Sequence, residues 1–298
     1  MSKFTIVGLG ELLWDVFPTH KQLGGAPSNF AYISSLLGDD GVVASRIGED
    51  ALGAEVVTRL QTLGLDCSCL QRDPVHATGT VKVALATDGQ PHFDITKDVA
   101  WDFLEWTPQL QQLAERADAV CFGSLAQRGL KSRETIQRFV DATRPEAVRI
   151  FDVNLRQAFY STDVLISSSK KATVLKLNHE EVPIMMKSAS GPAIDELRSA
   201  QWLCRRFGVK LVCITRGSAG SLLVSKDSHA EHPGFRVTVA DTVGAGDAFT
   251  ATLVHHYLRG SDLPTMNEAA NRIGSWVASK PGGTPAPEPE VIRQAQVS

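Results

Sequence analysis

Short apolar runs alternate with longer runs of helical character along this 298-residue chain, and this alternation constrains its fold more than any other feature. Several of the short runs are apolar throughout, as strands that are buried on both faces must be. Strands that alternate with helices pair in parallel through crossover connections. The sequence therefore predicts a Rossmann-like α/β sandwich, with a largely parallel central sheet and helices on both faces. The predicted strands are Phe4–Leu9, Val42–Ile47, Val81–Ala86, Ala119–Gly123, Val148–Val153, Val174–Leu177, Lys210–Ile214 and Ser221–Val224.

The predicted helices have ends that can be located from capping residues, prolines and glycines. Ser132, for example, is expected to cap a helix that Pro145 closes. The proline-rich tail Pro281–Pro289 is expected to lie extended on the surface. The helical runs lie between Pro27 and Gly38, Asp50 and Gly64, Arg133 and Thr143, Ala193 and Phe207, Asp247 and Arg259, and Asn267 and Ser279.

Two stretches near the start of the chain, Leu12–Leu23 and Arg72–Phe103, interrupt this rhythm with short extended runs and turn residues. We interpret them as a lid of β-strands over one end of the sheet; the alternative is a pair of ordinary long loops, although such loops in compact domains are usually functional. A chain of this length can bury a large core without disulfides or metals. The sequence thus predicts one domain, residues 1–298, with the lid inserted in it.

The composition narrows the class of protein. The formal net charge of −3 does not favour nucleic acid or an anionic membrane as a partner. The N-terminus carries no small-residue cleavage site of a signal peptide. The five cysteines lack metal-site spacing, which is typical of reduced thiols in a cytoplasmic protein. A dinucleotide oxidoreductase is disfavoured, because Leu13 stands where the third glycine of the Gly8-Leu9-Gly10 pattern belongs.

The segment Asp241–Phe249, with the sequence DTVGAGDAF, carries the clearest chemical signal. The small residues Gly244, Ala245 and Gly246 allow a tight turn into a helix, whose free N–H groups and dipole favour an anion. Asp247 lies at that point, where a carboxylate would repel phosphate unless it accepts a proton from an attacking hydroxyl. The alternative is that Asp247 only caps the helix.

Five segments in sequence order resemble the signatures of the PfkB (ribokinase-like) carbohydrate kinases, and the likeness is closest to bacterial fructokinase. The resemblance covers nearly the whole chain. The segments are Gly24–Asn29 (GGxxxN), Asp152–Arg156 (DxNxR), Asn178–Glu181 (NxxE), Thr215–Gly220 (TxGxxG) and Asp241–Phe249.

The resemblance implies a role for each motif in phosphoryl transfer from ATP. Asp247 would be the base, and the N–H groups of Gly244, Ala245 and Gly246 would hold the transferring phosphoryl charge. Asn178 and Glu181 would hold Mg²⁺, largely through water. The expected nucleotide-binding residues are Asn178, Thr215, Gly217, Gly220 and Asn271.

The implied sugar site comprises Asp15, Gly24, Gly25 and Asn29. The glycines allow close approach of the backbone, and Asn29 offers both a donor and an acceptor. Trp14 and Phe17, which flank Asp15, could contact the sugar or form a small core within the lid. Arg156 could reach a phosphate or close a salt bridge.

The implied activity is transfer of the γ-phosphoryl group of ATP to a sugar hydroxyl, with D-fructose as the expected substrate and fructose 6-phosphate as the product. The alternatives are another substrate (2-keto-3-deoxygluconate, ribose or a nucleoside) or an inactive sugar-binding regulator on the same fold. A homodimer through the lid is also expected. Ala286 has no side-chain oxygen, which argues against the K⁺ site that some family members have.

Overall fold

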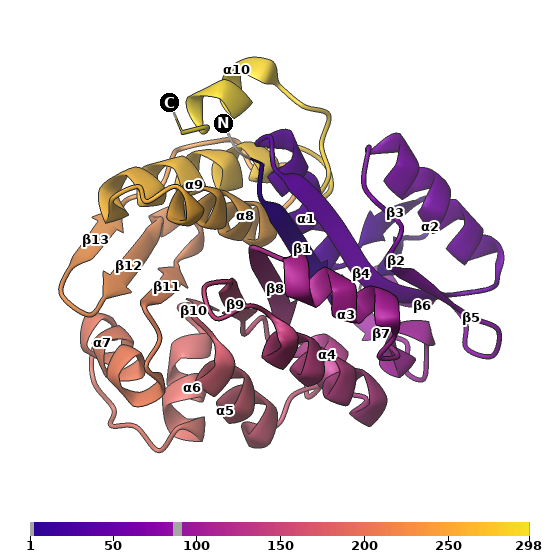
Figure 1. Ribbon diagram of the computed structural model, residues 1–298. Helices are drawn as coiled ribbons and strands as arrows, with labels where there is room; N and C mark the ends of the chain where they lie inside the picture. Colours follow the sequence, from indigo (N-terminus) through magenta and orange to yellow (C-terminus); the bar gives the residue numbers. More distant parts are fainter. Residues whose placement is uncertain (1–2, 86–90, 298) are drawn as a thin grey trace.

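The computed structural model describes residues 3–85 and 91–297, and within them nine strands form one large sheet (Figure 1). Adjacent strands of this sheet pair in parallel, except at one edge, where the last two strands are antiparallel to their neighbours. The predicted α/β class is confirmed. In spatial order the strands are β13 (His229–His232), β12 (Ser221–Ser225), β11 (Leu211–Thr215), β10 (Val174–Asn178), β9 (Val148–Asp152), β8 (Ala119–Gly123), β1 (Thr5–Leu9), β4 (Asp40–Gly48) and β5 (Leu70–Asp73).

Two hydrophobic clusters cover the two faces of this sheet, because successive strand residues point to opposite sides. Val7 and Ile6 of β1 belong to different clusters, each formed with the helices on its own side of the sheet. On the first face lie α3 (Pro108–Arg116), α4 (Leu130–Ala142), α5 (Thr162–Lys171), α6 (Glu181–Ser188) and α7 (Glu196–Phe207). On the second lie α1 (Ala26–Leu36), α2 (Ala51–Thr62), α8 (Ala245–Leu258), α9 (Leu263–Ala278) and α10 (Pro289–Gln294).

A second, smaller sheet has the order β3-β2-β6-β7. Its strands are β2 (Leu13–Val16), β3 (Lys21–Gly24), β6 (Gly79–Leu85) and β7 (Pro91–Ile95). Except for Gly24 at the end of β3, these strands lie within the two segments predicted to form the lid. The second predicted segment also includes residues that are not in this sheet, since β5 pairs with β4 in the large sheet. Residues 86–90, which include the end of the predicted strand Val81–Ala86, lie outside the described residues.

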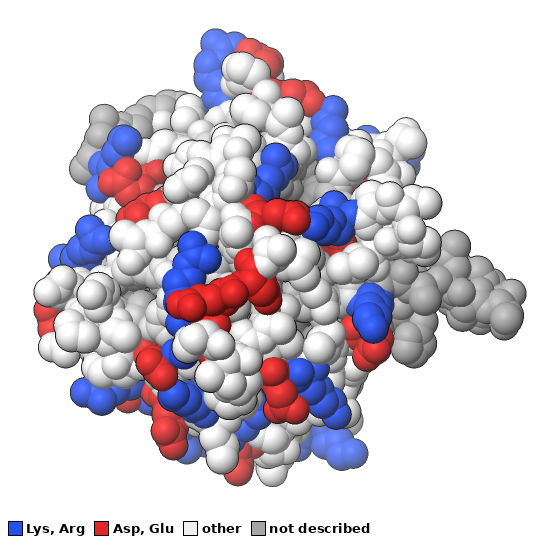
Figure 2. Space-filling model, turned by 90° about the vertical axis from the view of Figure 1, so that its right-hand side faces the viewer, with Lys and Arg blue, Asp and Glu red and all other residues white. Residues whose placement is uncertain are grey.

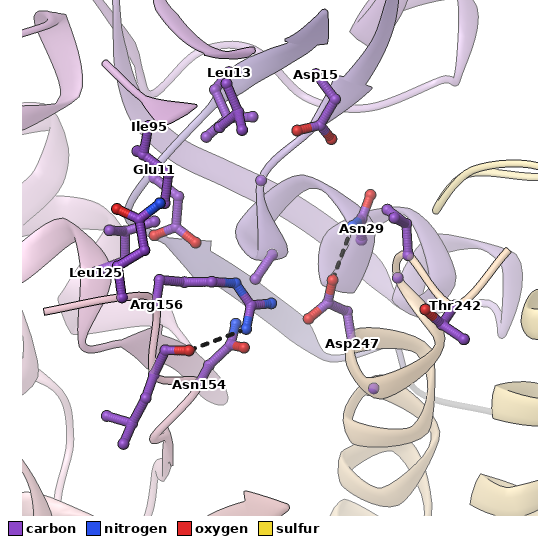
Figure 3. A pocket seen from close by; sticks show the side chains of 18 of the residues that line it. Glu11, Leu13, Asp15, Asn29, Ile95, Leu125, Asn154, Arg156, Thr242 and Asp247 are labelled. Carbon is purple, nitrogen blue, oxygen red and sulfur yellow. Dashed lines mark hydrogen bonds between the residues drawn. The ribbon is translucent and has the colours of Figure 1, made fainter. Parts of the chain in front are cut away.

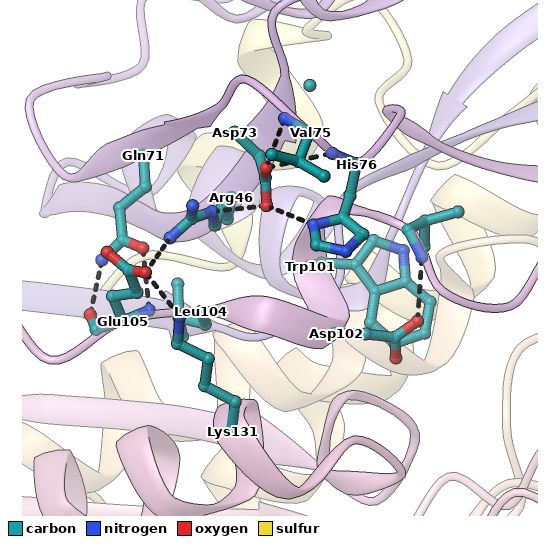
Figure 4. A network of polar contacts seen from close by, with 12 residues as sticks. Arg46, Gln71, Asp73, Val75, His76, Trp101, Asp102, Leu104, Glu105 and Lys131 are labelled. Carbon is teal, nitrogen blue, oxygen red and sulfur yellow. Dashed lines mark hydrogen bonds and ion pairs between the residues drawn. The ribbon is translucent and has the colours of Figure 1, made fainter.

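A buried polar network fixes the chain between β5 and β6 to the main body (Figure 4). The Asp73 carboxylate accepts hydrogen bonds from Arg46 Nε at 2.9 Å and from the backbone N–H groups of Val75 and His76. Although burial opposes ionisation, these donors hold the pKa of Asp73 at about 2. This is the physical reason why residues 72–78 belong to the body rather than to the lid.

Several predicted helix ends are wrong. Helix α4 begins at Leu130, and the Ser132 hydroxyl instead donates to Trp101 O and accepts from Leu104 N, inside the core. Helix α9 begins four residues earlier than predicted, because Asp262 caps it through Thr265 N. Helices α3, α5 and α6 were not predicted from the sequence pattern. The tail is not simply extended on the surface: Gly282, Gly283 and Pro285 are buried, and α10 follows.

Acidic and basic side chains are interspersed over the face of the molecule that Figure 2 shows. Exposed pairs of this kind, such as Lys3 with Asp40, contribute little to stability. Among the helices of the described residues, none is long and apolar enough to cross a membrane.

Candidate active site

A cavity of about 460 Å³ lies at the carboxyl ends of the parallel strands, beneath the small sheet. This is the edge at which ligands bind in open α/β sheets. Six of the predicted site residues line it, and Figure 3 shows the side chains of Asp15, Asn29 and Asp247 on its walls. The six are Asp15, Gly25, Asn29, Gly244, Gly246 and Asp247.

The loop before α8 turns sharply at Gly244, which has φ 75° and ψ −8°. A Cβ at this position would lie 2.4 Å from Gly283 Cα, so the buried tail requires glycine here. Asp241 joins the same two segments, since its carboxylate accepts from Val243 N at 3.0 Å and from Gly282 N at 3.1 Å. The N–H of Ala245 donates to Thr242 O at 3.3 Å. The first turn of α8 therefore points its N-terminus at the cavity, although Ala245 already has a partner for its N–H.

Asp247 lies in this first turn and is held by a residue distant in the sequence. Asn29 Nδ2 of α1 donates to Asp247 Oδ2 at 2.8 Å. Burial raises the pKa of Asp247 from 3.8 to about 6, while the hydrogen bond from Asn29 opposes part of this rise. The carboxyl is thus ionised at neutral pH and able to accept a proton.

Asp15 approaches the cavity from β2 of the small sheet. Its pKa is raised to about 6, first by burial and then by the nearby charge of Asp241. Gly24 does not line the cavity; a Cβ there would lie 2.4 Å from Asp15 Oδ2, so Gly24 makes room for this carboxylate. Gly25 lines the cavity with φ 109°, and a Cβ would lie 2.6 Å from Glu11 O. The two predicted glycines therefore serve different purposes, one behind Asp15 and one at the cavity wall.

The two aromatic residues that flank Asp15 lie in different environments. Phe17 lines the cavity, whereas Trp14 is buried and its Nε1 donates to Leu52 O at 3.1 Å, away from the cavity lining. Arg156 lines the cavity and donates to Leu155 O at 3.2 Å. Within the described residues Arg156 forms no ion pair, so the salt bridge considered for it is not present there.

Asn178 and Glu181 form a reciprocal pair at the start of α6. Glu181 N donates to Asn178 Oδ1 at 2.9 Å, and Asn178 N donates to Glu181 Oε2 at 2.8 Å. Leu155 N donates to the other carboxylate oxygen, Oε1, at 2.7 Å. Both residues lie beside the cavity and outside its lining.

Lys176 connects this pair to the cavity. Its ammonium lies 3.1 Å from Asp152 Oδ1, and the pKa of Lys176 is raised, against the effect of burial, by Asp152, Glu181 and Asp247. Three carboxylates around one ammonium leave a local excess of negative charge, and their oxygens are the ligand type that Mg²⁺ prefers. The residues present therefore fit a hydrated Mg²⁺ ion, although no group of three or more His, Cys, Asp or Glu side chains close enough to hold a metal directly occurs in the described part of the chain.

The four remaining predicted nucleotide residues lie outside the lining of this cavity. Thr215 ends β11, and Gly217 and Gly220 have φ values of 56° and 82° in the turn that leads to β12. A Cβ on Gly220 would lie 1.9 Å from His232 O, which requires glycine for packing. Asn271 is buried, and its Nδ2 donates to Ser221 Oγ and to Asn267 O, both at 2.7 Å. These contacts explain Gly220 and Asn271 through the fold itself.

Two charged residues of the cavity were missed in the sequence. Glu11 follows Gly10 at the end of β1 and is 5% exposed. Lys176 is the one charged residue of the apolar run Val174–Leu177, a signal that could have identified it. A charged side chain in a buried strand needs a partner, and so marks a site or an ion pair.

Comparisons with known proteins agree with this geometry. The profile of the pfkB family carbohydrate kinases matches residues 5–290. Fructokinase-1 of Zea mays is 27% identical over 316 residues, covering 97% of this chain and 96% of the maize protein. An uncharacterized sugar kinase from Pyrococcus horikoshii, crystallised in complex with ATP, has a TM-score of 0.81 at 28% identity and covers 98% of this chain and 99% of that chain. Fructokinase with bound ATP from Xylella fastidiosa has a TM-score of 0.87 at 21% identity and 99% and 98% coverage, a likeness in fold.

Proposed function

The chain belongs to the pfkB family of carbohydrate kinases, and from this premise we propose that it transfers the γ-phosphoryl group of ATP to the C6 hydroxyl of D-fructose. The observation that carries the proposal is that Asp247, held by Asn29 at the N-terminus of α8, faces the same cavity as Asp15. A base, a helix N-terminus and a hydroxyl-binding carboxylate then surround one space. Relatives named fructokinase and a relative crystallised with ATP support the choice of both substrates.

The proposed chemistry uses the two oxygens of Asp247 differently. Asn29 donates to Oδ2, which leaves Oδ1 to accept the proton of the attacking hydroxyl. As the hydroxyl attacks the γ-phosphorus, the bond to the leaving ADP oxygen breaks and the proton passes to Asp247. The first-turn N–H groups of Gly246 and Asp247 are suited to the charge on the transferring phosphoryl group, since initial N–H groups of a helix lack intrahelical partners. The N–H of Ala245, which the sequence also assigned to this anion hole, is less available to the phosphoryl group because it already donates to Thr242 O.

Mg²⁺ would supply charge neutralisation for the ATP phosphates. Glu181 and Asn178 would hold it through water, because their side-chain oxygens already accept backbone hydrogen bonds. The ammonium of Lys176 lies close to the first turn of α8, since a Cβ at position 246 would lie 3.3 Å from Lys176 Nζ. It would add a fixed positive charge beside the phosphates.

The charges of the cavity bear on the sugar. Lys21, Lys82 and Lys97 are absent from the cavity lining, so three lysines that the sequence brings near the lid do not argue for an acidic sugar. Lys21 instead pairs with Glu55 at 2.5 Å, and Lys97 Nζ lies 5.5 Å from the centroid of the Phe159 ring. Asp15 and Asn29 suit the hydroxyls of a neutral sugar.

A second candidate substrate is an acidic sugar such as 2-keto-3-deoxygluconate. Arg156 favours it, because this guanidinium lines the cavity without an ion pair among the described side chains and could bind a carboxylate. The same guanidinium could instead contact phosphate, which is compatible with fructose.

A competition assay tests the proposal. Purified protein receives ATP-Mg and equal concentrations of D-fructose, D-ribose, 2-keto-3-deoxygluconate and adenosine, and the products are resolved by mass. Fructose phosphate should dominate, since sites that bind substrate hydroxyls can discriminate by roughly 10⁴. If 2-keto-3-deoxygluconate phosphate dominates, the acidic-sugar candidate replaces fructose. If no sugar is phosphorylated, the inactive regulator remains.

A further inference from the structure

Glu11 presents a buried carboxyl group to the cavity from the main sheet, on a different wall from Asp15 and Asp247. It follows β1 at the carboxyl edge of the sheet, is 5% exposed and lines the cavity. Figure 3 shows its carboxylate pointing into the space that Asp15, Asn29, Asp247 and Arg156 surround. The mechanism proposed above gives this group no task.

The fold satisfies the carboxyl group of Glu11 only in part, through hydrogen bonds from the backbone N–H groups of Glu11 and Ala26. Its Oε2 is buried and has no hydrogen-bond partner among the described residues, and no ion pair joins Glu11 to a cation there. A buried carboxyl group with an unsatisfied oxygen costs stability, so an apolar or amide side chain of similar size would suit the fold better. A side chain that costs stability at the wall of a ligand cavity is typical of function.

We propose that Glu11 is a further substrate-contacting residue, whose Oε2 binds a hydroxyl of the sugar other than the one that is phosphorylated. The inference rests on the proposed function, since it assigns this contact to the same sugar. Asp15 and Glu11 would then hold the sugar from the small sheet and the large sheet respectively, while Asp247 accepts the proton. The contact would select for a hydroxyl at one position of the sugar.

Burial favours a neutral carboxyl at Glu11 when the sugar is bound. Burial raises the pKa of Glu11 to about 7, and the charge of Asp247 adds to this rise. Hydrogen bonds from the backbone N–H groups of Glu11 and Ala26 and the charge of Arg156 oppose it. The other ionisable groups that line the same cavity are Asp15 and Lys176, and Asp152 lines an adjoining pocket together with Glu11. A protonated carboxyl can donate to a hydroxyl oxygen as well as accept from it. Ionisation would also place a second negative charge near Asp247 and the incoming phosphates.

The experiment compares Glu11→Gln and Glu11→Met with wild type and with Glu134→Gln, a control on the exposed surface of α4. Steady-state rates are measured with D-fructose and with analogues that lack the hydroxyl at C1, C3 or C4. In Glu11→Met, kcat/KM for fructose should fall about ten-fold or more, because one substrate hydroxyl loses its partner. The KM for ATP should stay within about two-fold, and the thermal midpoint should be unchanged or higher.

The analogues identify a direct contact. For the wild type, one analogue should have a kcat/KM about ten-fold below that of fructose. For Glu11→Met, the same analogue and fructose should have nearly equal kcat/KM values, since removing both partners of one hydrogen bond costs no more than removing one. In Glu11→Gln, which has no titrating group at position 11, the KM for fructose should rise less between about pH 6 and 8 than we expect for the wild type.

Each other result overturns the inference. Glu11 variants with wild-type fructose kinetics would refute the contact. A structural role would be indicated if the fall in kcat/KM caused by the Glu11 substitution added to the fall caused by the missing hydroxyl for every analogue. A lowered thermal midpoint in both variants would indicate the same. A wild type that phosphorylates no sugar would refute the proposed function itself, and the contact with it, whereas the first two results leave that function standing.

Discussion

Replacement of Asp247 with Asn should abolish most of the activity and at the same time stabilise the protein. Asparagine keeps the size of the side chain and an oxygen that can accept from Asn29, but it cannot take a proton from the sugar. Loss of a general base typically lowers kcat by roughly 10²–10⁴. Binding of sugar and ATP should remain, so the KM values should change far less than kcat.

The effect on stability follows from the raised pKa of Asp247, from 3.8 to about 6. Below about pH 3 the carboxyl is protonated in the folded and unfolded states, and the charge costs nothing. Between about pH 4 and 6 the unfolded state ionises while the native state does not, so stability falls, and the penalty is complete above about pH 6. At about 1.4 kcal/mol per pK unit the penalty approaches about 3 kcal/mol, and partial exposure of Asp247 reduces the expected gain for Asn to about 1–2 kcal/mol.

Two measurements check this prediction. A coupled ADP-release assay should show wild-type kcat falling about ten-fold per pH unit below about pH 6, with a residual Asp247→Asn rate that lacks this dependence. Thermal unfolding at pH 8 should give the variant a midpoint roughly 2–3 °C above wild type, and the difference should vanish near about pH 3. Asp163→Asn is the matched control, because Asp163 also lies in the first turn of a helix, α5, but is exposed. Near-normal turnover of Asp247→Asn would refute its role as base, and a variant less stable than wild type at pH 8 would refute the electrostatic reasoning.

Three further predictions concern the metal, the lid and the sugar site. Glu181→Ala should raise the Mg²⁺ concentration for half-maximal rate and lower stability by about 1–3 kcal/mol, because two backbone N–H groups lose their acceptor; a metal titration and a denaturant curve check both, and an unaltered Mg²⁺ dependence would contradict the metal role. Saturating D-fructose should slow amide hydrogen exchange in β2, β3 and β7, since bound ligand suppresses local opening; equal protection without sugar would count against a closing lid. Gly24→Ala should raise the KM for fructose and leave the KM for ATP nearly unchanged, because the added Cβ would displace the Asp15 carboxylate; unchanged sugar kinetics would place Asp15 outside the sugar site.

The sequence was most informative where a function or a fold depends on a local pattern. Eight apolar runs were predicted to be strands, and each of them contains a strand of the large or the small sheet. Strands that are buried on both faces require such apolar runs. The motif around Asp247 predicted its place at a helix start, since small residues and a helix N-terminus are adjacent in the chain. Helix α5, with seven polar residues among its ten, gave a weaker pattern and was missed.

The tertiary structure decided how distant segments meet. Asn29 and Asp247 are 218 residues apart in the chain, and their hydrogen bond exists because α1 and α8 pack on the same face of the sheet. The predicted roles of Gly24 and Asn271 illustrate the limit, since one lies behind Asp15 and the other belongs to a buried amide network. Residue type alone could not separate contact with a ligand from contact with the fold.

By itself the sequence determined the fold class, the family and the place of the proposed base at a helix start, because periodicity and short motifs are properties of neighbouring residues. Only the tertiary structure decided which charges share the cavity and which of them are unsatisfied. Glu11 is the clearest case: in the sequence it is one acidic residue after a strand. In the structure, burial and the charge of Asp247 raise the pKa of this carboxyl group, and one of its oxygens has no partner among the described residues that surround the cavity. Burial and through-space charge depend on the whole folded chain, and no local pattern encodes them.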